Sequence, residues 1–169
     1  MNFILIIIFV LPLLVIAAGL LDLTTMKIPN RLNIAVLLSY FPVALLSGLD
    51  LKVIGLSCLI ALGILVIGMV MFALRWLGGG DAKLFAAVAL WMGPQGVLPF
   101  LILTAILGGL FCLIVISARG TLHVYRARLP GWGQRLLEPK GDIPYGVAIA
   151  AGALWAYPSS DIVLKFINI

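Results

Sequence analysis

The chain has 169 residues, of which 64% are hydrophobic and only 10% are charged, and its formal net charge is +5. Soluble domains carry about 25% charged residues, so this composition excludes an ordinary soluble protein and indicates an integral membrane protein. The positive charge does not indicate nucleic-acid binding. The basic residues are scattered at the ends of apolar segments, where snorkelling and lipid headgroups account for them. The length fits one compact helical bundle, and we expect a single transmembrane domain over residues 1–169.

Six apolar runs follow one another along the chain, and crossing a membrane takes about 20 residues. No basic residue precedes the first run, and it is longer than the apolar core of a signal peptide, so we expect a retained helix. The fourth run is too short to cross alone, unless Gly93-Pro94 is only a kink or the glycines before it dip into the membrane. We therefore expect an all-α membrane protein, a six-helix bundle with a short fourth helix behind a re-entrant glycine segment. The runs cover residues 3–21, 32–49, 53–74, 82–92, 96–118 and 143–157.

The basic residues predict the orientation of this bundle. Nine of the eleven lie in the loops after runs one, three and five, and only Lys52 and Lys165 lie on the other side. Because cytoplasmic loops carry an excess of Lys and Arg, we expect these three loops to be cytoplasmic and both termini to be periplasmic. The longest loop, residues 119–142, alternates cations with apolar side chains. We expect it to lie on the membrane surface, where anchoring to lipid explains it better than docking of a substrate.

Two acids stand at the ends of apolar runs. Asp22 closes the first run, and Asp81 follows three glycines before the fourth. A carboxylate at membrane depth costs roughly 2.5–3.5 kcal/mol, so it usually marks a functional site. With this orientation both acids fall at cytoplasmic helix ends, which predicts that they form a pair. The chain has only four other acids, Asp50, Glu138, Asp142 and Asp161.

Each acid also has a structural explanation. Asp81 after glycines is a good N-cap for the fourth helix, with about even odds from the local sequence alone. Asp22 is harder to explain in this way, because an acid at a helix C-terminus opposes the helix dipole. It could still face headgroups or pair with Lys27. Asp142 precedes Ile143-Pro144 and is expected to cap the last helix.

Three segments carry a resemblance to a known family. Asp22 is followed by Ile28-Pro29-Asn30, residues 78–84 read GGGDAKL, and residues 144–150 read PYGVAIA. In this order they resemble the GxGD-type intramembrane aspartyl proteases, specifically bacterial type IV prepilin peptidases. The residues of these motifs and the small size of the chain look most like those of the short peptidases of Flp (tight-adherence) pilus systems.

The resemblance implies that Asp22 and Asp81 are the catalytic pair. Two close carboxylates cannot both ionise cheaply, so one keeps a proton and the pair supplies both base and acid. Lys83 could bias the charge of Asp81 or reach to the interface, and Tyr145 could donate a hydrogen bond near the pair. The residues expected to bind substrate or support the motifs are Gly78, Gly80, Lys83, Pro144, Tyr145 and Gly146.

No cofactor or metal is expected. Cys58 and Cys112 each stand alone in an apolar run, so neither a zinc site nor a thiol redox motif is indicated. Longer members of the family carry a cysteine-rich cytoplasmic domain and also N-methylate the trimmed pilin. This chain shows no such domain, and we expect cleavage without methyl transfer.

The sequence thus predicts a multi-pass endopeptidase of the bacterial inner membrane. Its substrate would be the leader of a Flp-like prepilin, cut at the cytoplasmic face while the apolar helix of the pilin lies in the bilayer. One alternative is a proton-coupled transporter or channel subunit whose intramembrane aspartates relay protons. Another is a structural component of a pilus platform. That role would not explain why the chain carries an energetically unfavourable carboxylate at Asp22.

Overall fold

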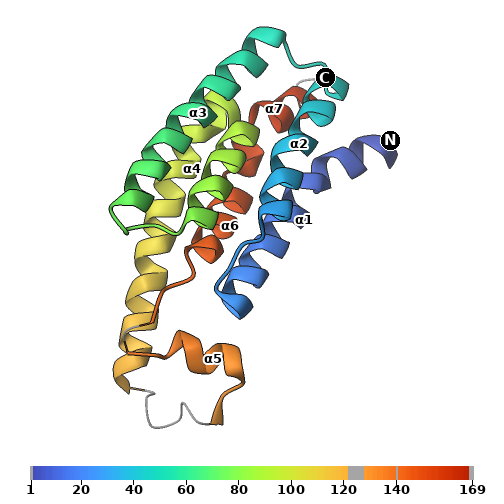
Figure 1. The fold of residues 1–169 in the computed structure, drawn as a ribbon. Coiled ribbons are helices and arrows are strands. Elements are labelled where there is room, and N and C mark those ends of the chain that lie inside the picture. Colours follow the sequence, from blue (N-terminus) through green and yellow to red (C-terminus); the bar gives the residue numbers. More distant parts are fainter. Residues whose placement is uncertain (1, 122–127, 140, 168–169) are drawn as a thin grey trace.

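The computed structural model describes residues 2–121, 128–139 and 141–167, with side chains from Ile8 onward. The described chain is helical, and its helices run alternately up and down one bundle (Figure 1). The first turn of α1 and the whole of α7 lie at one end of this bundle, and α5 lies at the other. The elements are α1 (Asn2–Thr25), α2 (Asn30–Leu46), α3 (Leu51–Ala73), α4 (Gly79–Thr121), α5 (Gly131–Leu136), α6 (Tyr145–Ala156), a 3₁₀ turn (Tyr157–Ser159) and α7 (Asp161–Ile167).

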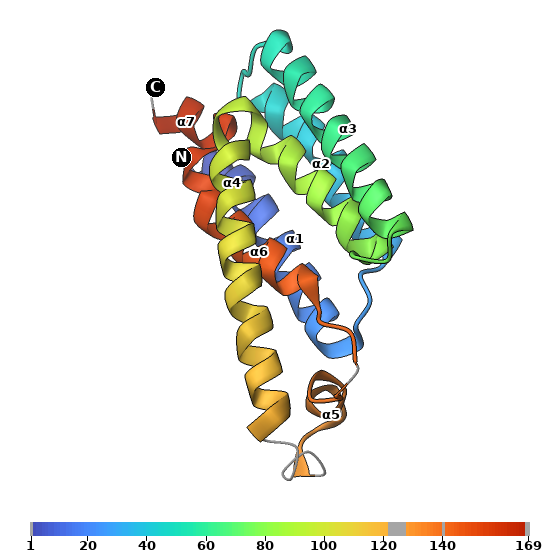
Figure 2. The same cartoon turned by 90° about the vertical axis from the view of Figure 1, so that its left-hand side faces the viewer.

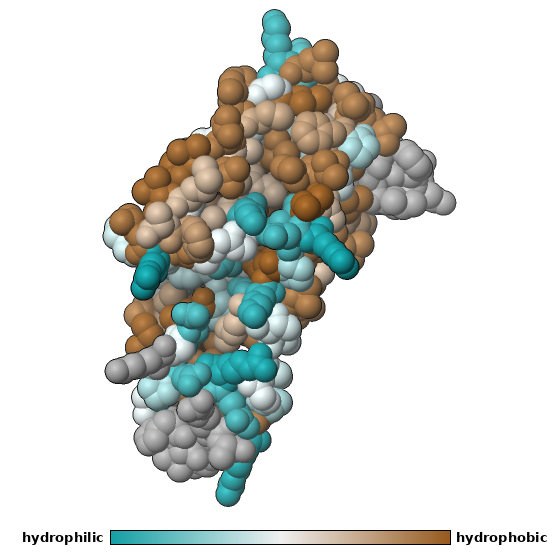
Figure 3. Space-filling model, viewed as in Figure 1, coloured by the Kyte–Doolittle hydropathy of each residue, from teal (hydrophilic) through white to brown (hydrophobic). Residues whose placement is uncertain are grey.

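Four stretches of helix are long and apolar enough to cross a membrane: Ile8–Thr25, Leu51–Ala73, Gly79–Thr121 and Tyr145–Ile167. α2 is also apolar but has only 17 residues. Large hydrophobic side chains remain exposed over the outside of these helices, among them Leu13 on α1 and Ile67 on α3. In Figure 3 hydrophobic side chains cover most of the upper part of the molecule, and hydrophilic ones gather in its lower half. This surface is suited to lipid.

α4 is two helices that meet at a sharp bend. Gly93 has φ 65° and ψ −173°, which interrupts the helix, and Figure 2 shows the two halves diverging from this point. Pro94 follows directly, and a residue before proline is disfavoured in helical conformation. Asp161 on α7 then accepts a hydrogen bond from the Gln95 N–H (3.2 Å) and caps the second half. The fourth and fifth apolar runs are therefore separate segments, because Gly93 is far more than a shallow kink.

The core forms where the first half of α4 packs between its neighbours. Its buried side chains include Leu84, Val88 and Trp91, which are all but inaccessible to solvent. The Trp91 indole N–H donates to the carbonyl oxygen of Val36 (2.7 Å) and so ties α4 to α2. Burying an indole without a partner would cost free energy, so this bond fixes the position of α4 beside α2.

The glycine segment joins α3 to α4 by a short turn. α3 ends at Ala73, and Arg75 in the turn adopts a positive φ of 61°. α4 begins at Gly79, and the carbonyl of Gly78 accepts the bond from the Ala82 N–H (3.0 Å). Only Gly78 of the three glycines is therefore non-helical, whereas Gly79 and Gly80 form the first turn.

We predict that the bend at Gly93 is sensitive to substitution. A Cβ on Gly93 would collide with the Asp161 carboxylate and lie 3.2 Å from Ser57 Oγ. Gly48 has a similar φ of 68°, but nothing lies within 4 Å of a Cβ there. Gly48→Ala should thus lower the free energy of unfolding only by the roughly 1–2 kcal/mol that a positive φ costs a residue with a Cβ. Gly93→Ala should cost roughly 1–3 kcal/mol more, because the added Cβ is overpacked and because a ψ of −173° at this φ is open essentially to glycine alone. Thermal unfolding of both variants in detergent measures the difference, and equal losses would show that the Asp161 contact is unimportant.

Candidate active site

Asp22 is buried near the end of α1, where only 4% of its surface is exposed. Its Oδ2 accepts a hydrogen bond of 2.7 Å from the backbone N–H of Gly146, which lies 124 residues later in the chain. Gly146 is the second residue of α6, so its N–H belongs to the four that no helical carbonyl can satisfy. The unfavourable position at the C-terminus of α1 is thus offset by the positive end of α6.

Asp81 lies in the first turn of α4. It does not cap the helix, because the cap position belongs to Gly78. The Asp81 carboxyl folds back toward Gly78, so that a Cβ on Gly78 would lie 2.6 Å from Asp81 Oδ2. The other oxygen, Oδ1, is buried and has no hydrogen-bond partner among the described residues. Gly78 therefore leaves room for the carboxyl, and Oδ1 remains free to bind another molecule.

The two aspartates line the same space. A cavity of about 530 Å³ has both Asp22 and Asp81 in its wall, together with Leu77 and Tyr145. A second cavity of about 550 Å³ lies against both acids on the side of Ile28 and Pro29. The fold thus brings together the two carboxyl groups that the sequence singles out, at the end of the bundle where α1 ends and α4 begins.

The Ile28-Pro29-Asn30 segment packs directly on the glycine turn. A Cβ on Gly80 would meet both the Cβ and the carbonyl oxygen of Ile28 at 3.3 Å. The Asn33 side chain donates to the Gly80 carbonyl (3.1 Å) from the first turn of α2. The first two motif segments are therefore in contact, and Gly80 is the residue that allows it.

The third motif segment opens α6 beside Asp22. Pro144 is the N-cap residue, in extended conformation and without a side-chain capping bond, and it is buried. A Cβ on Gly146 would lie 2.8 Å from Asp22 Oδ2 and 2.8 Å from Ile28 Cδ1. The Tyr145 ring packs on Gly108 of α4, and its hydroxyl lies beside Cys112 rather than bonding to either aspartate. Gly146 is therefore in contact with both Asp22 and Ile28, whereas Tyr145 only lines the cavity.

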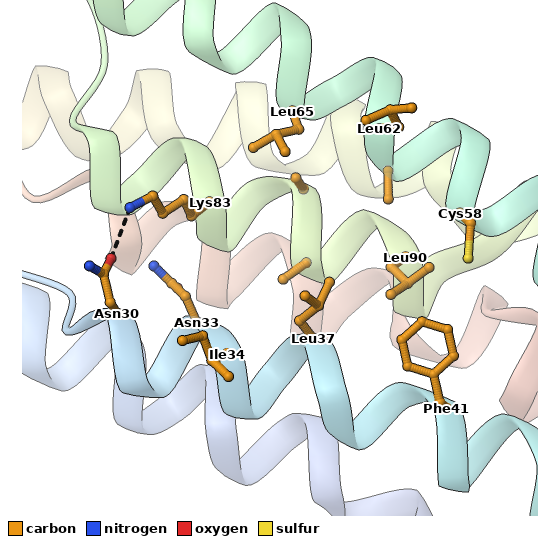
Figure 4. A pocket seen from close by; sticks show the side chains of 13 residues that line it. Asn30, Asn33, Ile34, Leu37, Phe41, Cys58, Leu62, Leu65, Lys83 and Leu90 are labelled. Atoms are coloured by element: carbon orange, nitrogen blue, oxygen red, sulfur yellow. Dashed lines mark hydrogen bonds between the residues drawn. The ribbon is translucent and has the colours of Figure 1, made fainter.

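Lys83 points away from the two acids. Its Nζ donates to Asn30 Oδ1 (2.9 Å), at the mouth of a separate cavity between α2, α3 and α4 (Figure 4). The Lys83 side chain is exposed. No contact therefore supports a direct effect of Lys83 on the charge of Asp81. Its bond to Asn30 instead joins α4 to the start of α2.

The structure adds wall residues that the sequence did not assign to the site. Met26, Leu77 and Asp142 line the cavity of the two aspartates. The expectation that Asp142 caps the last helix is wrong, because α6 starts three residues later and Pro144 occupies the cap. Asp142 is instead exposed, and its backbone carbonyl accepts a bond from Arg119 (2.9 Å). Sequence spacing alone gives no signal for such a placement, since it depends on how the loop folds back to α1.

Two further expectations concern a metal site and the loop over residues 119–142. Among the described residues no group of three His, Cys, Asp or Glu side chains could hold a metal ion. Part of the loop expected on the membrane surface, residues 122–127, lies outside the described residues, as does Lys140. The described part of this loop includes the short helix α5, which packs against α1.

Fold and site together define a class: a helical membrane protein with two aspartates that meet in one cavity at a helix-end turn. Comparison with known proteins agrees with this class. The model of the type IV leader peptidase family matches residues 9–113, a stretch that contains both Asp22 and Asp81 and ends before Pro144. The chain belongs to this family.

One curated relative is the "Prepilin leader peptidase/N-methyltransferase" of Bacillus subtilis (strain 168). It is 29% identical over 154 residues, which cover 90% of this chain but only 55% of the relative. The chain thus spans about half the length of the curated relative it matches. No solved structure matches the chain.

Proposed function

We propose that this protein is an intramembrane aspartyl endopeptidase that removes the leader peptide of type IV prepilins, of the Flp-like kind. Asp22 and Asp81 are the catalytic residues. The single observation that carries the proposal is that their carboxyl groups line one cavity, although they are 59 positions apart in the chain. Membership of the leader peptidase family supplies the substrate class.

The contacts of the two acids suggest different roles. The Gly146 N–H and the start of α6 favour negative charge on Asp22, which therefore acts as the base. Two close carboxyls do not both ionise cheaply, so Asp81 keeps a proton. Asp22 removes a proton from water as the water oxygen adds to the scissile carbonyl carbon, and Asp81 donates its proton to the carbonyl oxygen. Asp22 then returns its proton to the leaving nitrogen as the C–N bond breaks, and Asp81 takes back the proton of one hydroxyl. This releases a carboxylic acid and an amine and restores both aspartates to their starting states.

The same proposal sets the protein in the bacterial inner membrane as one transmembrane domain, with both termini periplasmic and six crossings. The up-and-down path of the helices supports it, since α2, the two halves of α4 and the other spans alternate in direction (Figure 1). The loops after α1 and α3 and the segment containing α5 then face the cytoplasm. Cleavage takes place at that face, beside the turn before Gly79, in which Leu74 and Trp76 are exposed.

A proton relay through the membrane has less support. A relay needs polar groups across the thickness of the bundle. Between Asp81 and the far end of the bundle, the buried side chains of the first half of α4 are apolar from Leu84 through Met92. The two acids therefore share one end and have no polar path along this helix.

Cleavage by the purified protein tests the proposal. We expect the protein in lipid vesicles to cut a prepilin into leader and mature chain, with mass spectrometry showing one new N-terminus directly after the leader. Intact prepilin after prolonged incubation with correctly inserted protein would overturn the assignment.

We further predict that this reaction needs no added cofactor. Water, the two carboxyls and the substrate balance the hydrolysis, so chelators should leave the rate unchanged. With this protein as the only enzyme, the mature pilin should carry a free amino group. A methylated N-terminus in the presence of a methyl donor would contradict the expectation of cleavage alone.

A further inference from the structure

Two apolar grooves open on the outside of the bundle, and only one of them continues into the aspartate cavity. The first, of about 420 Å³, lies between α3, both halves of α4 and α6. The second, of about 470 Å³, lies between α2, α3 and the first half of α4 (Figure 4). We call them the α3–α6 groove and the α2–α3 groove.

The α3–α6 groove shares two wall residues with the aspartate cavity. Leu77 and Tyr145 line both spaces, so the groove reaches the site at the turn before α4 and at the start of α6. The α2–α3 groove has no lining residue in common with either cavity beside the acids. On that side Ile28 packs on Gly80 and Asn33 bonds to the Gly80 carbonyl, which separates the groove from Asp81.

The bend at Gly93 gives the α3–α6 groove its shape. The two halves of α4 diverge from Gly93 toward the end of the bundle where the aspartates lie (Figure 2). Gly68 of α3 packs on Ala82 in the first half and Gly152 of α6 packs on Thr104 in the second, so the groove widens toward the site as the two halves diverge (Figure 2). Small residues, Gly68, Thr104 and Ala105, lie in its wall and allow close approach of a backbone.

The lining of this groove selects an apolar helix as its occupant. No charged side chain lines it, and Thr104 is buried with its hydroxyl against Gly152 of α6. An extended segment in lipid would leave its backbone N–H and C=O groups unsatisfied, whereas a helix pairs them internally. The first turn of such a helix still has free N–H groups, so the chain just before it is not held in helical form. At the widened end that preceding segment lies beside Asp22 and Asp81.

We infer that the α3–α6 groove binds the apolar helix of the prepilin, with the N-terminus of that helix at Leu77 and Tyr145 and the scissile bond just beyond. This inference rests on the proposed function. It assigns substrate binding to one face of the bundle and leaves the α2–α3 groove without a part in catalysis.

Site-specific crosslinking tests the choice between the two grooves. A photoreactive amino acid replaces Ile67 in the α3–α6 groove or Leu62 in the α2–α3 groove. Both residues are on α3 and are similarly exposed, at 61% and 57%. The protein also carries Asp81→Asn, so that a synthetic prepilin with a basic leader and an apolar helix stays uncut. We expect adducts from position 67 at least tenfold above those from position 62. Equal adducts, or adducts mainly from position 62, would overturn the inference.

A kinetic experiment gives an independent answer. Ala105 is exposed in the α3–α6 groove, so Ala105→Trp fills the groove without entering the core. We expect its KM for the prepilin to rise at least tenfold with kcat changed less than about twofold. Ile34→Trp, in the α2–α3 groove, should leave both constants unchanged. Unchanged kinetics of folded Ala105→Trp would reject the groove while leaving the peptidase proposal intact. Failure of the unaltered protein to cut prepilin would reject both, and crosslinking decides if Ala105→Trp does not fold.

Discussion

Asp22→Asn and Asp81→Asn should each abolish prepilin cleavage while the protein still inserts and folds. Asn has the size of Asp but cannot take up and return a proton during hydrolysis. Acid–base groups contribute about 10²–10⁴-fold to rates, so each variant should lose at least about 10²-fold. Initial rates of leader release in vesicles measure the effect, and thermal unfolding in detergent shows whether the fold survives. A folded variant that cuts prepilin at near the normal rate would contradict a shared catalytic role.

Asp50→Asn is the matched control for these two variants. Asp50 caps α3 at the opposite end of that helix from the glycine turn and accepts a bond from the Lys52 N–H (2.9 Å). Asn caps helices about as well as Asp, so neither activity nor stability should change appreciably. A large loss in this control would mean that any Asp→Asn change disturbs the protein, and the test of the pair would then carry no information on catalysis.

Gly146→Ala should inactivate the enzyme although the substituted residue has no reactive group. The added Cβ would lie within 2.8 Å of Asp22 Oδ2 and Ile28 Cδ1 and within 2.9 Å of Asp22 Cβ, so one of these groups must move. Asp22 would lose its hydrogen bond from the helix start or its position in the cavity. A misplacement of about 1 Å can cost about 10²-fold in rate, and we expect a loss of that size.

Gly109→Ala provides the comparison for Gly146→Ala. Gly109 is also helical, and a Cβ there meets nothing within 4 Å. Because Ala favours helix over Gly by up to about 1 kcal/mol, this variant should be as stable as the parent or more so, with full activity. If Gly146→Ala keeps the parent rate, the close contact between α6 and Asp22 does not position the carboxyl.

The contacts of Gly146 and Gly80 explain why three separated segments form one site. Ile28 touches both glycines, since a Cβ on either would lie within 3.3 Å of one of its atoms. It therefore lies between the start of α4, which carries Asp81, and the start of α6, which bonds to Asp22. A larger residue at either glycine would push Ile28 or an aspartate aside. The motif glycines are thus explained by close packing around the acids rather than by positive φ angles, which these two do not have.

The sequence by itself determined the class of protein, the apolar segments and the two acids. These conclusions depend on local properties: the length of an apolar run and the cost of a carboxylate at its end can be read without knowing what lies nearby. Even the position of the bend was visible as Gly93-Pro94, although not its sharpness. The short helices α5 and α7 were not predicted, because each is too short to show a clear period.

Only the tertiary structure decided what the acids contact. The partner of Asp22 is the Gly146 N–H, 124 positions away, and no pattern near Asp22 indicates it. The cap position considered for Asp81 belongs to Gly78, and the one expected for Asp142 belongs to Pro144. The bend of α4 at Gly93 likewise decides which of the two grooves reaches the site. All of these depend on the packing of distant segments, where burial and steric fit override local preference.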